Sequence, residues 1–374
     1  MVKKISYNHI DGKIQPVIIE NGSTYNDQRH GAVHTLTRKM SMNIYDISKL
    51  AGVSIATVSR VLNGSEKVSQ KTKEKVLAVM DEVNYTPNVF ARGLGLDSMK
   101  TIGIMVADAS DNFLANGIYY AEETLKKSGY DAILNCSGYD YSGKKKALEL
   151  LMSKRIDGLI MIGSMYIEPN EKDRQYLYEA SETIPIAIVN GYMDGNNIYC
   201  AYCDDFQAVY DATGQLLDSG REKILFLHRS LSYSARQKMS GYRAAFAKHG
   251  LEVNEDHIIL MDRDIDKAKE KLSLLYNAGL RFDAIVATHD RYAAMALKFA
   301  RDKGLSVPED LSIIGYDNTI LSVCTNPEIT SIDSKVSVTT TEAVNALLKA
   351  LDGQTPPKKI CIPGELIKRE TTDF

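Results

Sequence analysis

The stretch from Ser54 to Arg60 alternates hydroxyl groups with small aliphatic side chains around one arginine. An arginine can donate two parallel hydrogen bonds to O6 and N7 of guanine, the commonest base-specific contact between protein and DNA. Hydroxyl groups and the first N–H groups of a helix can bind phosphate, and Ile55 and Ala56 can touch thymine methyl groups. These residue types favour a helix that lies in a DNA groove, and a generic amphipathic helix is the alternative.

Two other stretches have spacings found in catalytic or metal sites. Gly138 to Lys145 reads GYDYSGKK, close to the phosphate-binding pattern G-x-x-x-x-G-K-[ST], but Lys145 stands where a magnesium-binding Ser or Thr belongs. We therefore expect a polar loop that leads into a helix with exposed lysines. Cys200 and Cys203 form a C-x-x-C pair without a second pair or nearby histidines, which indicates two half-buried thiols near a strand end. We predict no catalytic residue, no metal site, no cofactor and no enzymatic activity.

Three short helices are expected between residues 42 and 88. Asn43 can cap the first, with Asp46 at capping-box spacing, while Ser54 can cap the second and Ser69 the third. An Ala-Gly-Val turn separates the first two, as in a helix-turn-helix, whose second helix enters the major groove. Helices this short must pack together to bury a core, so we predict a small bundle with a partly exposed second helix.

Overall charge gives little attraction to nucleic acid or to a membrane. The net charge is −3 at pH 7, and residues 42–99 carry a net charge of only +1. DNA affinity would therefore depend on dimerisation and on a basic cluster from Lys67 to Lys75. No apolar run approaches the roughly 18 residues of a membrane-spanning helix, and the N-terminus lacks the apolar region of a secretory signal. We expect no membrane partner and a cytoplasmic location.

Residues 1–41 show no clear pattern of secondary structure. They mix Asn, Gly, His, Lys and Thr around one short apolar run, Val17-Ile18-Ile19, and Met40 or Met42 could serve as a start of translation. We expect this leader to be disordered, or to be sequence upstream of a misplaced start codon. In either case its deletion should leave DNA binding intact.

From Thr101 onward, predicted strands and helices alternate with a period of roughly 25 to 35 residues, as in βαβ units. Strands rich in Ile, Val, Leu and Met fit parallel sheets that are buried on both faces. About 270 residues are long for one sheet, so we predict two doubly wound lobes with a ligand cleft at the carboxyl ends of their strands. Lobe one is expected at about 100–202 and 333–355, and lobe two at about 203–330 with the C-terminal end.

The segment IYDISKLAGVSIATVSRVLNGSEKVSQKTKEKVLAVMDEVNYTPNVFARGL closely resembles the amino-terminal module of the lac repressor family. The βα repeats after it resemble the periplasmic-binding-protein-like sensor of the same family. The resemblance covers Met42 to Phe374 and implies a small all-α domain followed by a two-lobed α/β sensor. The implied parts are a helix-turn-helix domain at 42–88, a hinge helix or linker at 89–99, and an effector-binding and dimerisation domain at 100–374.

The resemblance also implies the DNA contacts. Ile55, Ala56 and Arg60 would read bases, and Leu94 of the hinge would insert into the minor groove and kink the operator. Phosphates would be held by the polar residues of the same helices. The implied set of DNA-binding residues is Tyr45, Ser54, Ile55, Ala56, Thr57, Ser59, Arg60, Asn63 and Leu94.

An effector site follows from the resemblance as well. Lys238 in SARQKMSGYRAAF matches the cationic residue that grips the effector, and Asp317 in SIIGYDN matches the position that binds ligand hydroxyls. DASDNFL departs from the usual S-N-P-F-F, and Phe113 remains as a stacking face for a sugar ring. Simpler roles are a helix cap for Asp317, a core position for Phe113 and a solvated side chain for Lys238. The implied set is Phe113, Asn190, Lys238, His289, Asp290 and Asp317.

Together these implications predict a homodimeric transcription regulator, a repressor that binds a pseudo-palindromic double-stranded DNA operator. A small effector, a sugar or sugar derivative, would bind in the cleft between the lobes. Lys238, ARGL and GYDNTILS are locally similar to catabolite control proteins of the family, so a global regulator with a phosphorylated carrier protein as co-regulator is the alternative. A solute-binding protein with a helical appendage is less favoured, because the secretory signal is missing.

Overall fold

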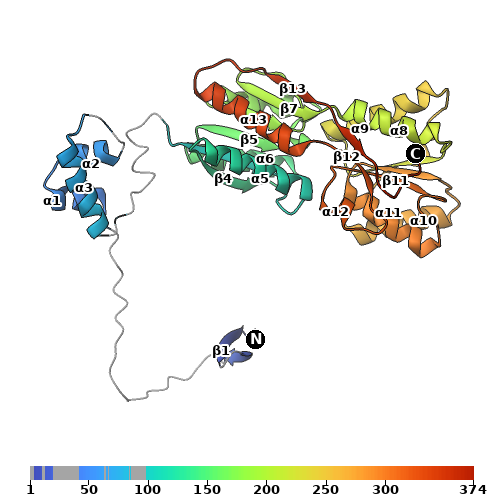
Figure 1. Ribbon diagram of the computed structural model, residues 1–374, viewed down its shortest axis with the longest axis horizontal. Helices are drawn as coiled ribbons and strands as arrows, with labels where there is room; N and C mark the ends of the chain where they lie inside the picture. The colour runs from blue at the N-terminus through green and yellow to red at the C-terminus, as the bar shows by residue number, and fades with distance from the viewer. Residues whose placement is uncertain are drawn as a thin grey trace. The chain divides into compact units, whose positions relative to one another are not determined.

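The chain forms two compact units, Met1–Pro87 and Asn88–Phe374. Figure 1 shows the three helices of the first unit and the two-lobed α/β body of the second. No helix in the described parts of the chain is both long and apolar enough to cross a bilayer. The computed structural model describes residues 4–10, 13–19, 42–62, 65, 67–83, 85 and 98–374.

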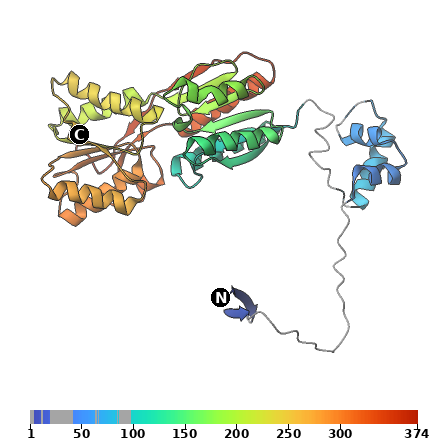
Figure 2. The same ribbon diagram turned by 180° about the vertical axis from the view of Figure 1, so that it is seen from behind.

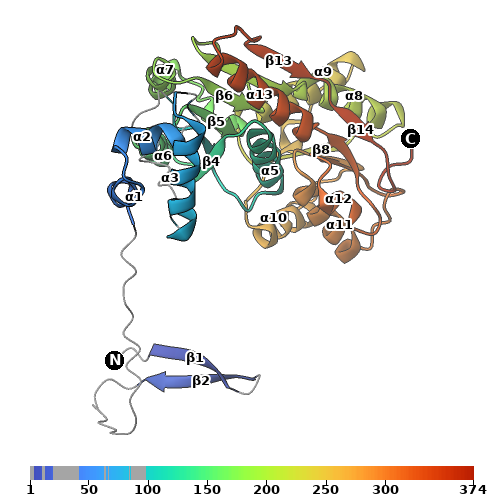
Figure 3. The same cartoon turned by 60° about the vertical axis from the view of Figure 1, so that its left-hand side comes forward.

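Part of the leader forms a β-hairpin. Strands β1 (Lys4–Ile10) and β2 (Lys13–Ile19) pair in antiparallel fashion, and Figure 3 shows them side by side. The sequence between them is Asp11-Gly12, a dipeptide that strongly favours two-residue hairpin connections. The expectation of disorder is therefore wrong for residues 4–10 and 13–19, because composition alone does not register this turn signal. Residues 20–41 lie outside the described part of the chain.

Three helices share one small core in the first unit. They are α1 (Ile44–Ala51), α2 (Ile55–Leu62) and α3 (Gln70–Glu82). The apolar residues that the sequence places at helical spacing meet between them, as expected for helices too short to bury a core alone. The buried residues of this core are Ile47, Ala51, Val58, Val61, Val68, Val76 and Met80.

The predicted helix caps are confirmed. The Asn43 side chain accepts hydrogen bonds from the N–H groups of Tyr45 and Asp46, and the Asp46 carboxylate accepts one from the N–H of Asn43. The Ser54 hydroxyl accepts from the Thr57 N–H at 3.1 Å, and the Ser69 hydroxyl caps α3 in the same way. These bonds satisfy N–H groups that have no partner inside the helix.

Lobe one is a six-stranded parallel sheet with the order β13-β7-β6-β5-β3-β4. Helices α5 (Asn112–Lys127) and α13 (Val336–Leu351) cover one face, and α6 (Tyr141–Ser153) and α7 (Gln175–Ser181) cover the other. The strands are β3 (Thr101–Val106), β4 (Asp131–Cys136), β5 (Gly158–Ile162), β6 (Ile186–Val189), β7 (Ile198–Cys203) and β13 (Lys359–Ile362), and the 3-10 turns are η1 (Ser164–Tyr166) and η2 (Glu171–Arg174).

Lobe two has the strand order β14-β12-β11-β10-β8-β9, parallel except for β14. Helices α8 (Asp205–Asp218) and α9 (Tyr233–Lys248) cover one face, and α10 (Ile265–Asn277) and α11 (Asp290–Lys303) cover the other. The remaining elements are β8 (Ile224–His228), β9 (Ile258–Leu260), β10 (Ala284–Ala287), β11 (Ser312–Tyr316), β12 (Thr330–Asp333), β14 (Glu365–Ile367), α12 (Ile320–Val323) and η3 (Glu255–His257).

The chain crosses between the lobes three times. It passes from β7 to α8, returns from β12 to α13, and leaves again from β13 to β14. Figures 1 and 2 show the late, red segments lying along both lobes. The predicted fold of a small helical domain followed by two doubly wound lobes is confirmed. The predicted end of lobe one near residue 355 is too early, because β13 pairs with β7 as an edge strand.

Candidate DNA-binding surface and effector cleft

The small-residue face of α2 is open to solvent. Val58 and Val61 point into the core, whereas Ile55 keeps 38% of its surface exposed. On α1, Tyr45 is 61% exposed. A large apolar side chain left open beside hydroxyl groups and an arginine fits a surface that meets a partner. The predicted contacts that the structure leaves exposed or partly exposed are Tyr45, Ser54, Ile55, Ala56, Thr57, Ser59 and Arg60.

The start of α2 has its own hydrogen bonds. The Ser54 and Thr57 hydroxyls lie 2.9 Å apart, so the two side chains hold each other at the N-terminus of the helix. This end carries partial positive charge and free N–H groups, which suit a phosphate. Asn63 and Leu94, the predicted wedge residue, lie outside the described residues, as does the predicted hinge except for its last two residues, 98 and 99.

A second group of predicted residues meets between the two lobes. Apart from Lys238, which lies in the second turn of α9, each lies just beyond the carboxyl end of a strand or at the start of the helix after it, where parallel sheets bind ligands. The cavity there has a volume of only about 40 Å³, against about 300 Å³ or more for ordinary ligand pockets. A sugar would therefore need the lobes to separate before it could enter. The lining includes Asp111, Phe113, Ser164, Asn190, Arg229, Lys238, Thr288, His289 and Asp317.

An ion pair closes this cleft from opposite lobes. Asp111, at the start of α5 in lobe one, lies 2.8 Å from Arg229, which follows β8 in lobe two. The Ser164 hydroxyl donates to Ser232 across the same gap at 2.9 Å. Burial would lower the pKa of Arg229, but the charge of Asp111, its hydrogen bond to Arg229 and the nearby tyrosines together outweigh burial and raise that pKa. Arg229 was not among the predicted residues, although its place directly after the strand KILFLH could have indicated it.

His289 and Asp317 form a second polar pair at the cleft, both within lobe two. The Nδ1 of His289 lies 3.0 Å from an oxygen of Asp317. Burial, with the nearby charge of Arg229, lowers the pKa of His289, so the neutral ring donates through Nδ1 to the carboxylate. Asp317 has φ 91° and Asn190 has φ 71°, left-handed values that cost non-glycine residues energy and cluster at functional sites. The structure thus brings five of the six predicted effector residues to one cavity, all except Asp290.

Lys238 is buried and bonded within lobe two. Its Nζ lies 3.3 Å from the Thr288 carbonyl oxygen, 3.3 Å from the centre of the Tyr316 ring and 3.9 Å from Asp205. The Tyr316 hydroxyl donates to Asp205 in turn. Burial raises the pKa of Asp205, and the charge of Lys238 opposes that rise. Lys238 lines the cavity but already has Asp205 as a carboxylate partner. The simpler role suggested by the sequence, a solvated lysine, is therefore wrong.

Asp290 and Phe113 have structural contacts in addition to their place at the cleft. The Asp290 carboxylate accepts from the Thr319 N–H and hydroxyl and from the Ser331 hydroxyl, at 2.6 to 2.8 Å. These bonds tie the start of α11 to the loop after β11 and to β12. Phe113 is 7% exposed and belongs to the core beneath α5. The two residues therefore have packing roles that do not require an effector.

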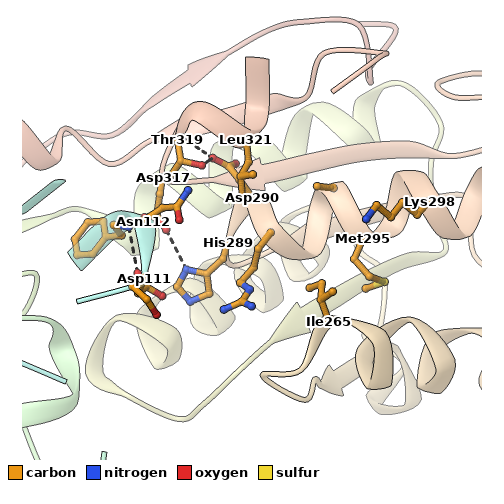
Figure 4. A pocket seen from close by; sticks show the side chains of 14 residues that line it. Asp111, Asn112, Ile265, His289, Asp290, Met295, Lys298, Asp317, Thr319 and Leu321 are labelled. Carbon is orange, nitrogen blue, oxygen red and sulfur yellow. Dashed lines mark hydrogen bonds and ion pairs between the residues drawn. The ribbon is translucent and has the colours of Figure 1, made fainter. Parts of the chain in front are cut away.

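A wider pocket adjoins the cleft on the side of α11. It has a volume of about 320 Å³ and shares Asp111, His289 and Asp317 with the central cavity. Figure 4 shows these side chains grouped at one end, with Met295 and Lys298 further along α11. This pocket therefore offers space of ligand size beside the smaller central cavity.

Asp290 should make stability depend on pH. Burial raises its pKa to about 6 from 3.8, so the carboxyl stabilises the fold when protonated, and this contribution is lost as pH rises from about 4 through 6. In Asp290→Asn the loss should be absent. Chemical unfolding at several pH values should show the variant gaining about 3 kcal/mol on the wild type between pH 4 and 7. The exposed Asp131→Asn variant is the control, and a parallel shift in both variants would contradict the assignment.

The two stretches with catalytic spacing have other roles. Asp140 caps α6 by accepting from the Gly143 N–H at 2.8 Å, and Lys144 donates to Glu168 at 2.5 Å and to the Met165 carbonyl oxygen at 2.6 Å. Lys145 and Lys146 are exposed as predicted, whereas Lys144 is buried because it anchors the turn after β5. A nucleotide phosphate would need the N-terminus of α6 and the ammonium group of Lys144. Both are already hydrogen-bonded to protein groups.

The C-x-x-C thiols lie within β7 and are fully buried, not half-buried. Cys200 and Cys203 are three positions apart on a strand, so their side chains point to opposite faces of the sheet. They cannot ligate one metal together. In the described part of the chain, no group of three or more His, Cys, Asp or Glu is arranged to hold a metal ion.

Known proteins resemble both units. Residues 43–88 match the family described as bacterial regulatory proteins, lacI family. Residues 99–370 match periplasmic binding proteins and sugar binding domain of LacI family. The second match alone covers more than half of the chain. It ends in the last turn of lobe two and so takes in every element of the sensor.

Individual relatives extend the similarity over nearly the whole chain. An HTH-type transcriptional regulator of Lachnoclostridium phytofermentans is 50% identical over 333 residues, 89% of this chain and 100% of the relative. Catabolite control protein A of Priestia megaterium is 30% identical over 89% of this chain and 100% of its own length. The lac repressor dimer bound to operator and the anti-inducer ONPF has a TM-score of 0.77 at 25% identity, over 88% of this chain and 98% of that one. The chain belongs to the lacI family of bacterial regulatory proteins and is a DNA-binding transcriptional regulator, not an enzyme.

Proposed function

We propose that the chain is a repressor that binds a pseudo-palindromic operator as a homodimer in the cytoplasm. A small carbohydrate in the cleft controls it. The open face of α2 carries the DNA half of the proposal, since Ile55, Ala56 and Arg60 stand free to meet base edges. One such helix reads a short half-site, and two copies related by a twofold axis read an inverted repeat.

The cleft carries the effector half of the proposal. Its hydroxyl, carboxylate and guanidinium groups come from both lobes, so a polyhydroxylated ligand would contact both at once. A ligand that binds one arrangement of the lobes more tightly than another shifts the population between them. The arrangement of the two DNA modules in the dimer would follow that shift.

Selection of duplexes from a random pool by the purified chain tests this function. The expected product is an inverted repeat, and a duplex with one half-site should bind more weakly than the full site. A sugar that raises the melting temperature should also change the operator affinity, because the two binding events are linked. Recovery of no preferred sequence, or equal affinity for one and two half-sites, would contradict the proposal.

A second candidate is a catabolite-control-type regulator with a phosphorylated carrier protein as co-regulator. The similarity to catabolite control protein A of Priestia megaterium favours it. In that case the phosphorylated carrier, added at constant operator concentration, should increase DNA binding, and the unphosphorylated carrier should not. A sugar effect without any effect of the carrier would favour the first proposal.

A further inference from the structure

The ion pair between Asp111 and Arg229 is well shielded from water. The two side chains are 8% and 9% exposed. Asp111 also accepts hydrogen bonds from the N–H groups of Phe113 and Leu114, at 3.1 and 3.3 Å, as the cap of α5. These bonds fix its carboxylate at the cleft, opposite Arg229.

No cation lining the central cavity in the described structure lacks a carboxylate. Arg229 has Asp111 at 2.8 Å, and Lys238 has Asp205 at 3.9 Å. A further carboxylate, Asp317, lines the same cavity and accepts from His289. The charged groups around the cavity therefore provide no excess positive charge that would attract an anionic ligand.

The remaining polar lining consists mostly of hydroxyl groups. Serines 164, 230, 232 and 234 line the cavity, and so does Thr288. Thr288 is 2% exposed, and its hydroxyl has no hydrogen-bond partner within the described structure. A buried hydroxyl without a partner costs free energy, and a ligand hydroxyl would supply the missing bond.

We propose that Asp111 makes the cleft select uncharged, polyhydroxylated ligands and reject phosphorylated or carboxylated ones. The proposal rests on the proposed function, in which this cleft holds the effector. An entering anion would either face the carboxylates of Asp111 and Asp317, or take Arg229 and leave Asp111 buried without its partner. Both outcomes cost binding energy. A neutral sugar carries no charge that competes with Asp111 for Arg229.

Binding of inorganic phosphate and of glucose 6-phosphate to the full chain tests the proposal without knowledge of the natural effector. Calorimetry at constant ionic strength is the measurement, because screening would otherwise change with ligand concentration. Asp111→Asn removes the negative charge but retains a good helix cap, and Asp111→Ser serves as a second variant of the same kind. Each variant should bind both anions at least about tenfold more tightly than the wild type, because Arg229 loses its carboxylate.

Further variants separate the cleft from anion binding elsewhere. The gain should vanish in Asp111→Asn with Arg229→Gln, and Asp140→Asn, which removes another capping carboxylate outside the cleft, should show no gain. Saturable binding of phosphate by the wild type that Arg229→Gln abolishes would overturn the proposal. So would an unchanged anion affinity in both Asp111 variants, or an equal gain in Asp140→Asn. Failure of neutral sugars to affect DNA binding would count against the proposed function. The comparison of anion affinities would still test the role of Asp111, because it does not depend on that result.

Discussion

Replacement of Arg60 by alanine is expected to lower the affinity of the dimer for its operator by about 10²- to 10⁴-fold. A two-point contact with guanine is worth about 1–3 kcal/mol, and the proposed dimer would lose two of them. Arg60 is exposed on the face of α2 away from Val58 and Val61, so the substitution should leave the three-helix core intact. Fluorescence anisotropy with a labelled operator duplex measures the effect.

Two other substitutions distinguish base reading from general attraction. Arg60→Lys keeps the charge but loses the paired donors, so it should retain binding to random DNA and lose preference for the operator. Arg301→Ala removes a charge from the exposed surface of lobe two, where the side chain is 79% exposed, and should leave operator affinity unchanged. Equal losses in Arg60→Ala and Arg301→Ala would show that α2 does not read bases.

Replacement of Lys238 by methionine is expected to lower the free energy of unfolding of the sensor by about 3–5 kcal/mol at neutral pH. Methionine fills the space of the lysine stem, but Asp205 loses the only cation near it that the structure describes. The Asp205 side chain is 2% exposed, so water cannot replace that partner. Urea unfolding followed by circular dichroism gives the change in free energy.

The loss of unfolding free energy in Lys238→Met should grow as pH rises. The folded-state pKa of Asp205 is already raised by burial, and loss of Lys238 raises it further. A carboxyl of this kind stabilises the fold when protonated, so the deficit should shrink as pH falls toward the unfolded value near 4 and be largest at alkaline pH. Lys238→Met with Asp205→Asn should recover most of the loss. A deficit equal at pH 5 and pH 8 would refute the coupling.

Features decided over short distances could be predicted from the sequence. The caps at Asn43 and Ser69 depend on residues no more than three positions away, and the structure has both. Strands β5, β6 and β10 are wholly buried and read GLIMI, IAIV and AIVA. By contrast, β13 reads KICI, a short edge strand with two exposed residues, and its pairing with β7 depends on a segment more than 150 positions away.

The cleft shows a similar limit. Residues such as Asn190 and Asp317 could be predicted because they end apolar strands, where parallel sheets place their ligands. The pairing of Asp111 with Arg229 could not, because these residues are 118 positions apart and belong to different lobes. Asp290 was predicted as an effector residue together with Asp317. Only the structure shows that its carboxylate already accepts three hydrogen bonds from the protein.

The three crossings between the lobes have a consequence for how the regulator comes apart. Lobe one needs α13 and β13, which follow most of lobe two in the sequence, and lobe two needs β14 after them. Melting of either lobe would therefore release segments that the other lobe requires, and the sensor should unfold in one cooperative step. The helix-turn-helix core uses seven buried residues of a single continuous stretch. Because this core is small and belongs to a separate unit, we expect it to unfold independently of the sensor.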